Sequence, residues 1–94
     1  MIKDNRSYKI AVVEDNLGDF ILLQDYLEET VIAPTIYHFN CYKDFYKFYE
    51  TDSNFNEVDI VLLDLSLPDK NGEVLVRDVL KITPKIPVVA LTGF

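Results

Sequence analysis

The chain has 94 residues, of which 49% are apolar or aromatic, so it can bury one hydrophobic core and is expected to form a single domain. Its single cysteine rules out a disulfide framework, and no Cys/His spacing resembles a zinc site. The net charge of −7 repels phosphate backbones and anionic lipid, which excludes nucleic acid and membrane surfaces as expected partners. No apolar stretch is long enough for a signal peptide or for a membrane span of roughly 20 residues, so we expect a cytoplasmic protein.

The first part of the chain predicts a strand, a helix and a second strand. Residues 10–13 form an apolar run without polar alternation, typical of a central strand that is buried on both faces of a parallel sheet. Asn16 is suited to cap a helix that begins at Leu17, and Asp19 favours the positive end of its dipole. The apolar stripe of this helix consists of Phe20, Leu23 and Leu27. Residues 35–39 alternate in polarity, which indicates a strand nearer a sheet edge.

The second part of the chain predicts two more helices and two more strands. Residues 42–50 place aromatic side chains at helical intervals, and residues 52–57 are predicted to be a polar loop. The further apolar runs, both typical of central strands, are residues 58–63 and 87–91. Between them, residues 73–82 predict a helix with an apolar stripe, which ends before Pro84.

This alternation of strands and helices predicts an α/β fold, a doubly wound parallel sheet with helices on both faces. In open sheets of this class, ligands bind at the carboxyl ends of the strands, beside the point where the strand order reverses. The residues that follow each strand are therefore the first candidates for a functional site.

Acidic side chains follow two of the predicted strands. Glu14 and Asp15 come after the first strand, Asp64 after the third, and the hydroxyl of Thr92 after the fourth. Taken alone, Glu14 or Asp15 would more often be a helix cap or a solvated loop charge. Asp64 differs, because a carboxylate at the end of a buried strand costs free energy unless it is paired or metal-bound. Clustered carboxylates repel one another unless a cation or a proton compensates, and a site with oxygen ligands only favours Mg²⁺.

Three segments of the chain carry a family resemblance. They are residues 10–16 (IAVVEDN), 59–72 (DIVLLDLSLPDKNG) and 87–93 (PVVALTG). In this order and spacing they resemble the receiver domain of two-component response regulators, and the resemblance extends over residues 1–94. The stretch VEDNLGD near the start also resembles the opening of small stand-alone receivers, including those that are paired with phytochrome-type kinases.

The resemblance implies a flavodoxin-like receiver fold with strand order 2-1-3-4 and a role as a phosphorelay signalling switch. Asp64 would accept a phosphoryl group from a phosphohistidine of a sensor histidine kinase or phosphotransfer protein. Mg²⁺ would be bound by Asp15, Asp64 and the main-chain carbonyl of Ser66, with Glu14 acting through water. Thr92 would donate its hydroxyl to a phosphoryl oxygen. The chain would then be a phosphoacceptor that at most catalyses its own phosphorylation and dephosphorylation, not a multiple-turnover enzyme.

Receiver domains also have elements that these residues do not include. The family pattern continues with a further helix, a fifth strand that carries a lysine for the phosphoryl group, and a final helix, so we expect a domain that is incomplete at its C-terminus. Lys70, in the loop after the third strand, is not a convincing substitute for that lysine. Residues 88–91 would lie at an exposed sheet edge, which favours self-association.

Two other functions compete with the phosphorylation switch. The first is a pseudo-receiver that acts as a protein interaction module without being phosphorylated. The second, an aspartate-nucleophile phosphatase, is disfavoured because such enzymes usually carry a second Asp where Ser66 stands. The only histidine, His38, is interpreted as an ordinary strand residue and not as a phosphodonor.

Overall fold

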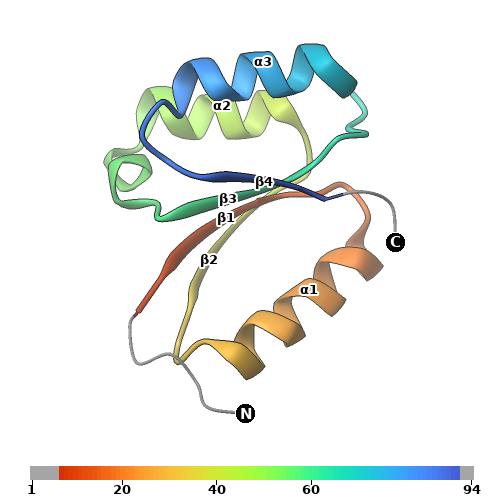
Figure 1. Ribbon diagram of the computed structural model, residues 1–94. Helices are drawn as coiled ribbons and strands as arrows, with labels where there is room; N and C mark the ends of the chain where they lie inside the picture. The colour runs from red at the N-terminus through yellow and green to blue at the C-terminus, as the bar shows by residue number, and fades with distance from the viewer. Residues whose placement is uncertain (1–6, 92–94) are drawn as a thin grey trace.

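The computed structural model describes residues 7–91, which form a four-stranded parallel sheet with helices on both faces (Figure 1). The strands are β1 (Lys9–Val13), β2 (Thr35–Phe39), β3 (Ile60–Asp64) and β4 (Val88–Leu91). The helices are α1 (Leu17–Thr30), α2 (Tyr42–Thr51) and α3 (Gly72–Ile82), and a 3-10 helix, η1 (Ser53–Glu57), follows α2. Each predicted strand and helix is present, and the bounds of the strands differ from the predicted ones by at most two residues.

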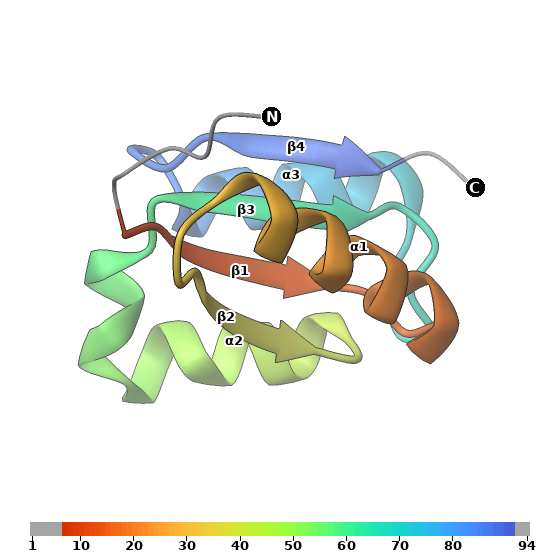
Figure 2. The same cartoon turned by 90° about the horizontal axis from the view of Figure 1, so that it is seen from below.

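The strand order in the sheet is β2-β1-β3-β4, as predicted. Helix α1 covers one face of the sheet, and α2 and α3 cover the other (Figure 1). Seen from below, α1 crosses in front of the strands, which lie side by side and point the same way (Figure 2). Because β1 and β3 are neighbours, the loops that follow them meet at the carboxyl end of the sheet. This is the point where the strand order reverses.

Alternate residues of the central strands supply two separate cores. The larger core lies between the sheet and α2 and α3, and its fully buried members include Ala11, Val13, Val61, Leu63, Phe45, Leu75 and Val79. The smaller core lies between the sheet and α1, and its buried members are Ile10, Val12 and Leu62. The period of two along β1 and β3 therefore accounts for apolar runs without polar alternation, because both faces of these strands are covered.

The predicted stripe of α1 faces the smaller core, where Phe20, Leu23 and Leu27 pack against it. The helix begins after Asn16, whose side chain accepts a hydrogen bond from the backbone N–H of Asp19, as the predicted cap requires (3.0 Å). None of the residues of α1 is fully buried, so this helix packs less closely against the sheet than α2 and α3 do.

The segment after α2 departs from the predicted polar loop. Residues Ser53–Glu57 form the 3-10 helix η1, whose start is capped by the side chain of Asp52, which accepts a hydrogen bond from the N–H of Asn54 (2.9 Å). Phe55 is buried and packs in the larger core. The single apolar side chain among polar neighbours carries no period, which is why the pattern gave no sign of this element.

Strand β4 has the apolar composition of a central strand, but the predicted strand order places it at a sheet edge, and this placement is confirmed. In the part of the chain that the structure describes, β4 pairs only with β3 and lies at the sheet edge opposite β2. Val89 is 44% exposed, and Ala90 is exposed as well. An apolar edge strand with a free row of backbone donors and acceptors is open to pairing with another chain.

None of the helices within residues 7–91 has the length and apolar character needed to cross a membrane.

Candidate metal centre

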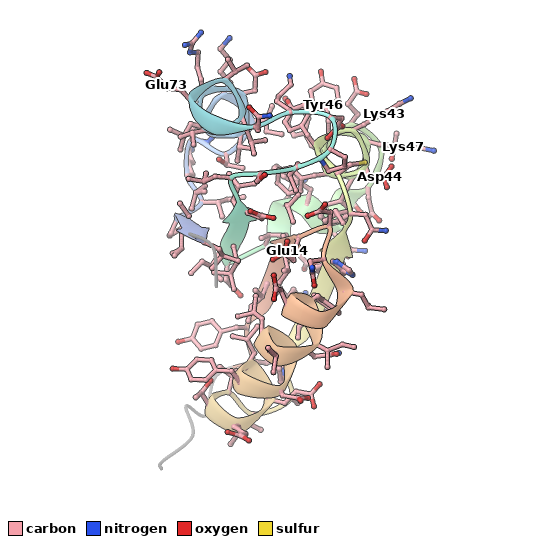
Figure 3. The ribbon with its side chains drawn as sticks, turned by 90° about the vertical axis from the view of Figure 1, so that its right-hand side faces the viewer. Glu14, Lys43, Asp44, Tyr46, Lys47 and Glu73 are labelled. Carbon is pink, nitrogen blue, oxygen red and sulfur yellow. The ribbon has the colours of Figure 1, made fainter. Side chains whose placement is uncertain are left out.

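The carboxyl ends of β1 and β3 bring three carboxylates together. Glu14, Asp15 and Asp64 each offer an oxygen, and these oxygens all lie within 4.8 Å of one another. They line a hollow of about 390 Å³ whose walls are made by Glu14, Asp15, Asn16, Asp19, Asp64, Ser66 and Leu91. Figure 3 looks onto this end of the sheet and shows Glu14 near its centre. The juxtaposition that was expected from the strand ends is therefore present, although 49 positions separate Asp15 and Asp64.

Glu14 is the buried member of this cluster, with 2% of its surface exposed. Its backbone N–H donates to the carbonyl of Phe39 at the end of β2 (2.9 Å). Its carbonyl accepts a hydrogen bond from Nε2 of His38 (2.8 Å), whose ring stacks on Phe20 with the centroids 3.7 Å apart. Since a carbonyl only accepts, His38 carries its proton on Nε2. Hydrogen bonds with β2 thus fix both the backbone N–H and the carbonyl of Glu14, and with them the end of β1.

The environment of Glu14 opposes its ionisation. Burial first, and then the hydrogen bond that its protonated form shares with Asp64, raise its pKa from 4.5 to about 7. The backbone N–H of Asn16 donates to Oε2 of Glu14 (3.4 Å) and partly opposes this shift. A carboxyl group whose pKa lies near neutrality because it is buried and close to a second carboxylate is a group that a nearby cation would ionise.

The other two carboxylates are more accessible. Asp15 is exposed, and Asp64 is half-buried at the last position of β3. Oδ1 of Asp64 accepts a hydrogen bond from the backbone N–H of Ser66 (3.0 Å), which holds the carboxylate above the loop that follows β3. Within residues 7–91, none of the ion pairs involves Glu14, Asp15 or Asp64. The cluster therefore combines uncompensated negative charge with access for a ligand.

These residues fit a hard divalent cation. The hollow offers carboxylate and backbone oxygens without a His or Cys side chain in its lining, which is the donor set that Mg²⁺ prefers. Ser66 lines the hollow, as expected of a residue whose carbonyl would serve as a ligand.

One predicted site residue, Thr92, lies outside the described residues. Two residues that line the hollow, Asn16 and Asp19, were predicted only as helix-capping residues. Their sequence pattern indicates a helix start and gives no sign that they also line the hollow. They do so because a helix that starts at a strand end turns its first residues toward the same site. Lys70 is engaged elsewhere, since its Nζ pairs with Asp78.

No protein-family model matches the chain, and no curated protein matches it. Solved structures of response regulators do match it. The MaeR response regulator bound to beryllium trifluoride is 28% identical, with a TM-score of 0.76, over 93% of this chain and 68% of its own. The phosphorylated cyanobacterial phytochrome response regulator RcpA is 26% identical, with a TM-score of 0.76, over 90% of this chain and 64% of its own.

A third match bears on the metal. The Mn²⁺-bound form of response regulator Rcp1 is 26% identical, with a TM-score of 0.74, over 93% of this chain and 66% of its own. The chain spans about two thirds of the length of each of these three structures.

Proposed function

Since this chain is a response regulator receiver domain with a role in two-component signalling, we propose that it is a phosphorelay switch whose phosphoacceptor is Asp64. A carboxylate oxygen of Asp64 attacks the phosphorus of a phosphohistidine. The P–N bond breaks, the imidazole of the donor leaves and takes up a proton, and an acyl phosphate forms on Asp64. The donor is a sensor histidine kinase or a phosphotransfer protein of the cytoplasm.

The observation that carries this proposal is the convergence of Glu14, Asp15 and Asp64 within 4.8 Å at the carboxyl ends of neighbouring strands. Asp15, Asp64 and the carbonyl of Ser66 would hold Mg²⁺ directly, and Glu14 would act through water. A divalent cation bound there would neutralise negative charge on the transferring phosphoryl group. The Mn²⁺ of the Rcp1 structure and the phosphorylated state of RcpA support the same assignment by similarity.

The chain's own residues have separate parts in this reaction. Asp64 is held for attack by the N–H of Ser66, and it lies half-buried where a phosphodonor can reach it. Glu14 is fixed through its backbone by β2, so its carboxylate stays within the cluster. Thr92 would donate its hydroxyl to a phosphoryl oxygen. These residues make the chain a stoichiometric phosphoacceptor and not an enzyme of many turnovers.

The test is to incubate the full-length protein with Mg²⁺ and a small acyl phosphate donor, trap the product by reduction, and locate it by mass spectrometry. We expect modification at Asp64 that requires Mg²⁺ and disappears in the Asp64→Asn variant. Modification that survives Asp64→Asn would contradict the proposal. Its complete absence, together with tight binding of a partner to unmodified protein, would favour the interaction-module alternative.

For the 94-residue chain by itself, we also propose self-association through β4. The support is its apolar composition together with its place at the edge of the described sheet, where Val89 is exposed. A second copy of the chain would then supply the strand that pairs with this edge.

A further inference from the structure

The first turn of α2 is capped by a residue from a distant loop. The N-cap position, Cys41, makes no side-chain hydrogen bond to the helix. Instead the carboxylate of Asp69 accepts two hydrogen bonds, from the N–H of Tyr42 to Oδ1 (3.0 Å) and from the N–H of Lys43 to Oδ2 (2.9 Å). Two of the otherwise unpaired amides of the helix are thereby satisfied by one carboxylate. Figure 3 shows the loop between β3 and α3 passing beside the start of α2, where Lys43 is labelled.

The electrostatics of Asp69 agree with this geometry. Desolvation would raise its pKa, but the hydrogen bonds from the amides of Lys43 and Tyr42 outweigh it, so the pKa lies below its usual value. The positive end of the α2 dipole acts in the same direction. The cap is therefore a charged one throughout the neutral pH range.

The next residue in the loop, Lys70, makes a second attachment. Its Nζ lies 4.3 Å from the centroid of the Tyr42 ring and pairs with the carboxylate of Asp78 on α3. Consecutive loop residues thus hold the first turn of α2 through its amides and through its ring. We call these contacts of Asp69 and Lys70 with Tyr42, Lys43 and Asp78 the loop clasp.

The clasp lies at the tip of the loop that carries a proposed metal ligand. Ser66 and Asn71 form an isolated antiparallel bridge, and the N–H of Gly72 donates to the carbonyl of Leu65 (2.8 Å), so the loop is closed at its base. Leu67 is buried in the larger core and anchors the arm next to Ser66.

We propose that Asp69 is a positioning residue for the metal centre: through the loop clasp it fixes the loop that presents the carbonyl of Ser66, and so links metal binding to the order of the first turn of α2. This inference rests on the proposed metal centre. Leu67 in the larger core and Asp69 at the start of α2 anchor the loop at two points, so the ligand segment has little freedom. By linkage, a clasp that favours metal binding is itself stabilised when metal binds.

The first test compares divalent cation affinity among variants, measured by calorimetry with Mn²⁺ and with Mg²⁺ as competitor. We expect Asp69→Ala to weaken Mn²⁺ binding roughly tenfold, the size typical of losing a partner that orients a metal ligand. Asp69→Asn, which keeps one acceptor oxygen, should lie between Asp69→Ala and the unmodified chain. It also keeps the test valid if Asp69→Ala does not fold.

Two further variants separate positioning from charge. Asp52→Ala removes a capping carboxylate of equal charge from η1, which lies outside the metal centre, and it should leave Mn²⁺ affinity unchanged. Lys70→Met removes a positive charge and breaks the other half of the clasp. If the clasp positions the loop, Lys70→Met weakens Mn²⁺ binding as Asp69→Ala does, whereas a purely electrostatic effect would strengthen it.

The second readout follows α2 directly. On addition of Mg²⁺, hydrogen exchange of the amides of Tyr42 and Lys43 should slow in the unmodified chain, and this change should be absent in Asp69→Ala. A cap that serves only the stability of α2 would leave exchange independent of Mg²⁺.

The outcomes distinguish this inference from the proposed function. If the unmodified chain binds no Mn²⁺, the metal centre itself is wrong. If it binds Mn²⁺ and Asp69→Ala binds it equally well, or if Lys70→Met binds it more tightly, the metal centre stands and the role of Asp69 is overturned.

Discussion

At the scale of single residues, the fold changes the chemistry of Glu14 most. The side chain is nearly inaccessible, yet it ends beside the carboxylate of Asp64. Its backbone is fixed by hydrogen bonds with Phe39 and His38, so the side chain stays within the cluster. A residue whose sequence neighbours indicate an ordinary strand-end charge therefore becomes a group that titrates near pH 7.

This shift predicts a pH dependence of stability in the absence of divalent cations. The pKa of Glu14 is about 7 in the folded state against 4.5 for the free group, so the folded state binds the proton more tightly. The resulting stabilisation is complete below pH 4.5 and is lost as the pH rises through about 7. We expect Glu14→Gln, which stays neutral, to be more stable than the unmodified chain by about 3 kcal/mol at pH 8 and equally stable at low pH.

Urea unfolding of both proteins over this pH range measures the difference, because other titrating groups cancel in the comparison. Addition of Mg²⁺ should reduce the difference at pH 8, since only the unmodified chain has the Glu14 carboxylate for the cation to compensate. A stability difference that does not change between pH 4 and pH 8 would show that folding leaves the pKa of Glu14 unchanged.

At the scale of elements, the junction between the loop after β3 and helix α3 depends on a backbone conformation. Gly72, the first residue of α3, has a φ of +59°. This left-handed conformation follows the loop bridge between Ser66 and Asn71 and lets the chain turn into the helix.

We therefore expect Gly72→Ala to lower the free energy of unfolding by about 1 kcal/mol, through backbone strain alone. A Cβ at this position would meet no atom within 4 Å, so steric overlap adds nothing. Urea denaturation measures the change, and Gly18→Ala in α1 is the matched control. At Gly18 the gain in helix propensity is opposed by a 3.3 Å contact with Oδ1 of Asn16, so little change is expected. Equal effects of the two substitutions would contradict the strain argument.

At the scale of the whole molecule, charge and apolar surface are unevenly distributed. The carboxylates gather at the carboxyl ends of the strands, while the apolar strand β4 lies at one edge of the described sheet. The net charge of −7 opposes association in general. Salt screens this repulsion, however, and it does not prevent another strand from pairing with the edge of β4.

The proposed self-association through β4 is tested by light scattering of the 94-residue chain over a range of concentrations. We expect the mean mass to rise with concentration, and we expect Val89→Lys to remain monomeric because a charge on an edge strand opposes pairing. Val74→Lys is the control, since Val74 is also exposed but lies on α3. A chain that stays monomeric at high concentration would contradict this proposal.

Much of this protein could be predicted from sequence because its signals are local. Apolar runs and helical stripes indicated every strand and α-helix, and the order of strands and helices placed Glu14, Asp15 and Asp64 at one end of a sheet. The 3-10 helix around Phe55 was missed because one buried aromatic residue has no period. The place of β4 at the edge of the described sheet was predicted from the family resemblance and not from its composition, which describes how apolar a strand is and not which neighbours it has.

The sequence by itself determined the type of each element and the chemistry at the strand ends, since both depend on residues close together along the chain. Only the tertiary structure decided which groups share an environment. It buried Glu14 against Asp64, which raises the pKa of Glu14, and it brought Asp69 to two amides of α2 that lie 26 and 27 positions away in the chain. Burial and capping over such separations depend on how the elements pack, and local patterns do not encode that packing.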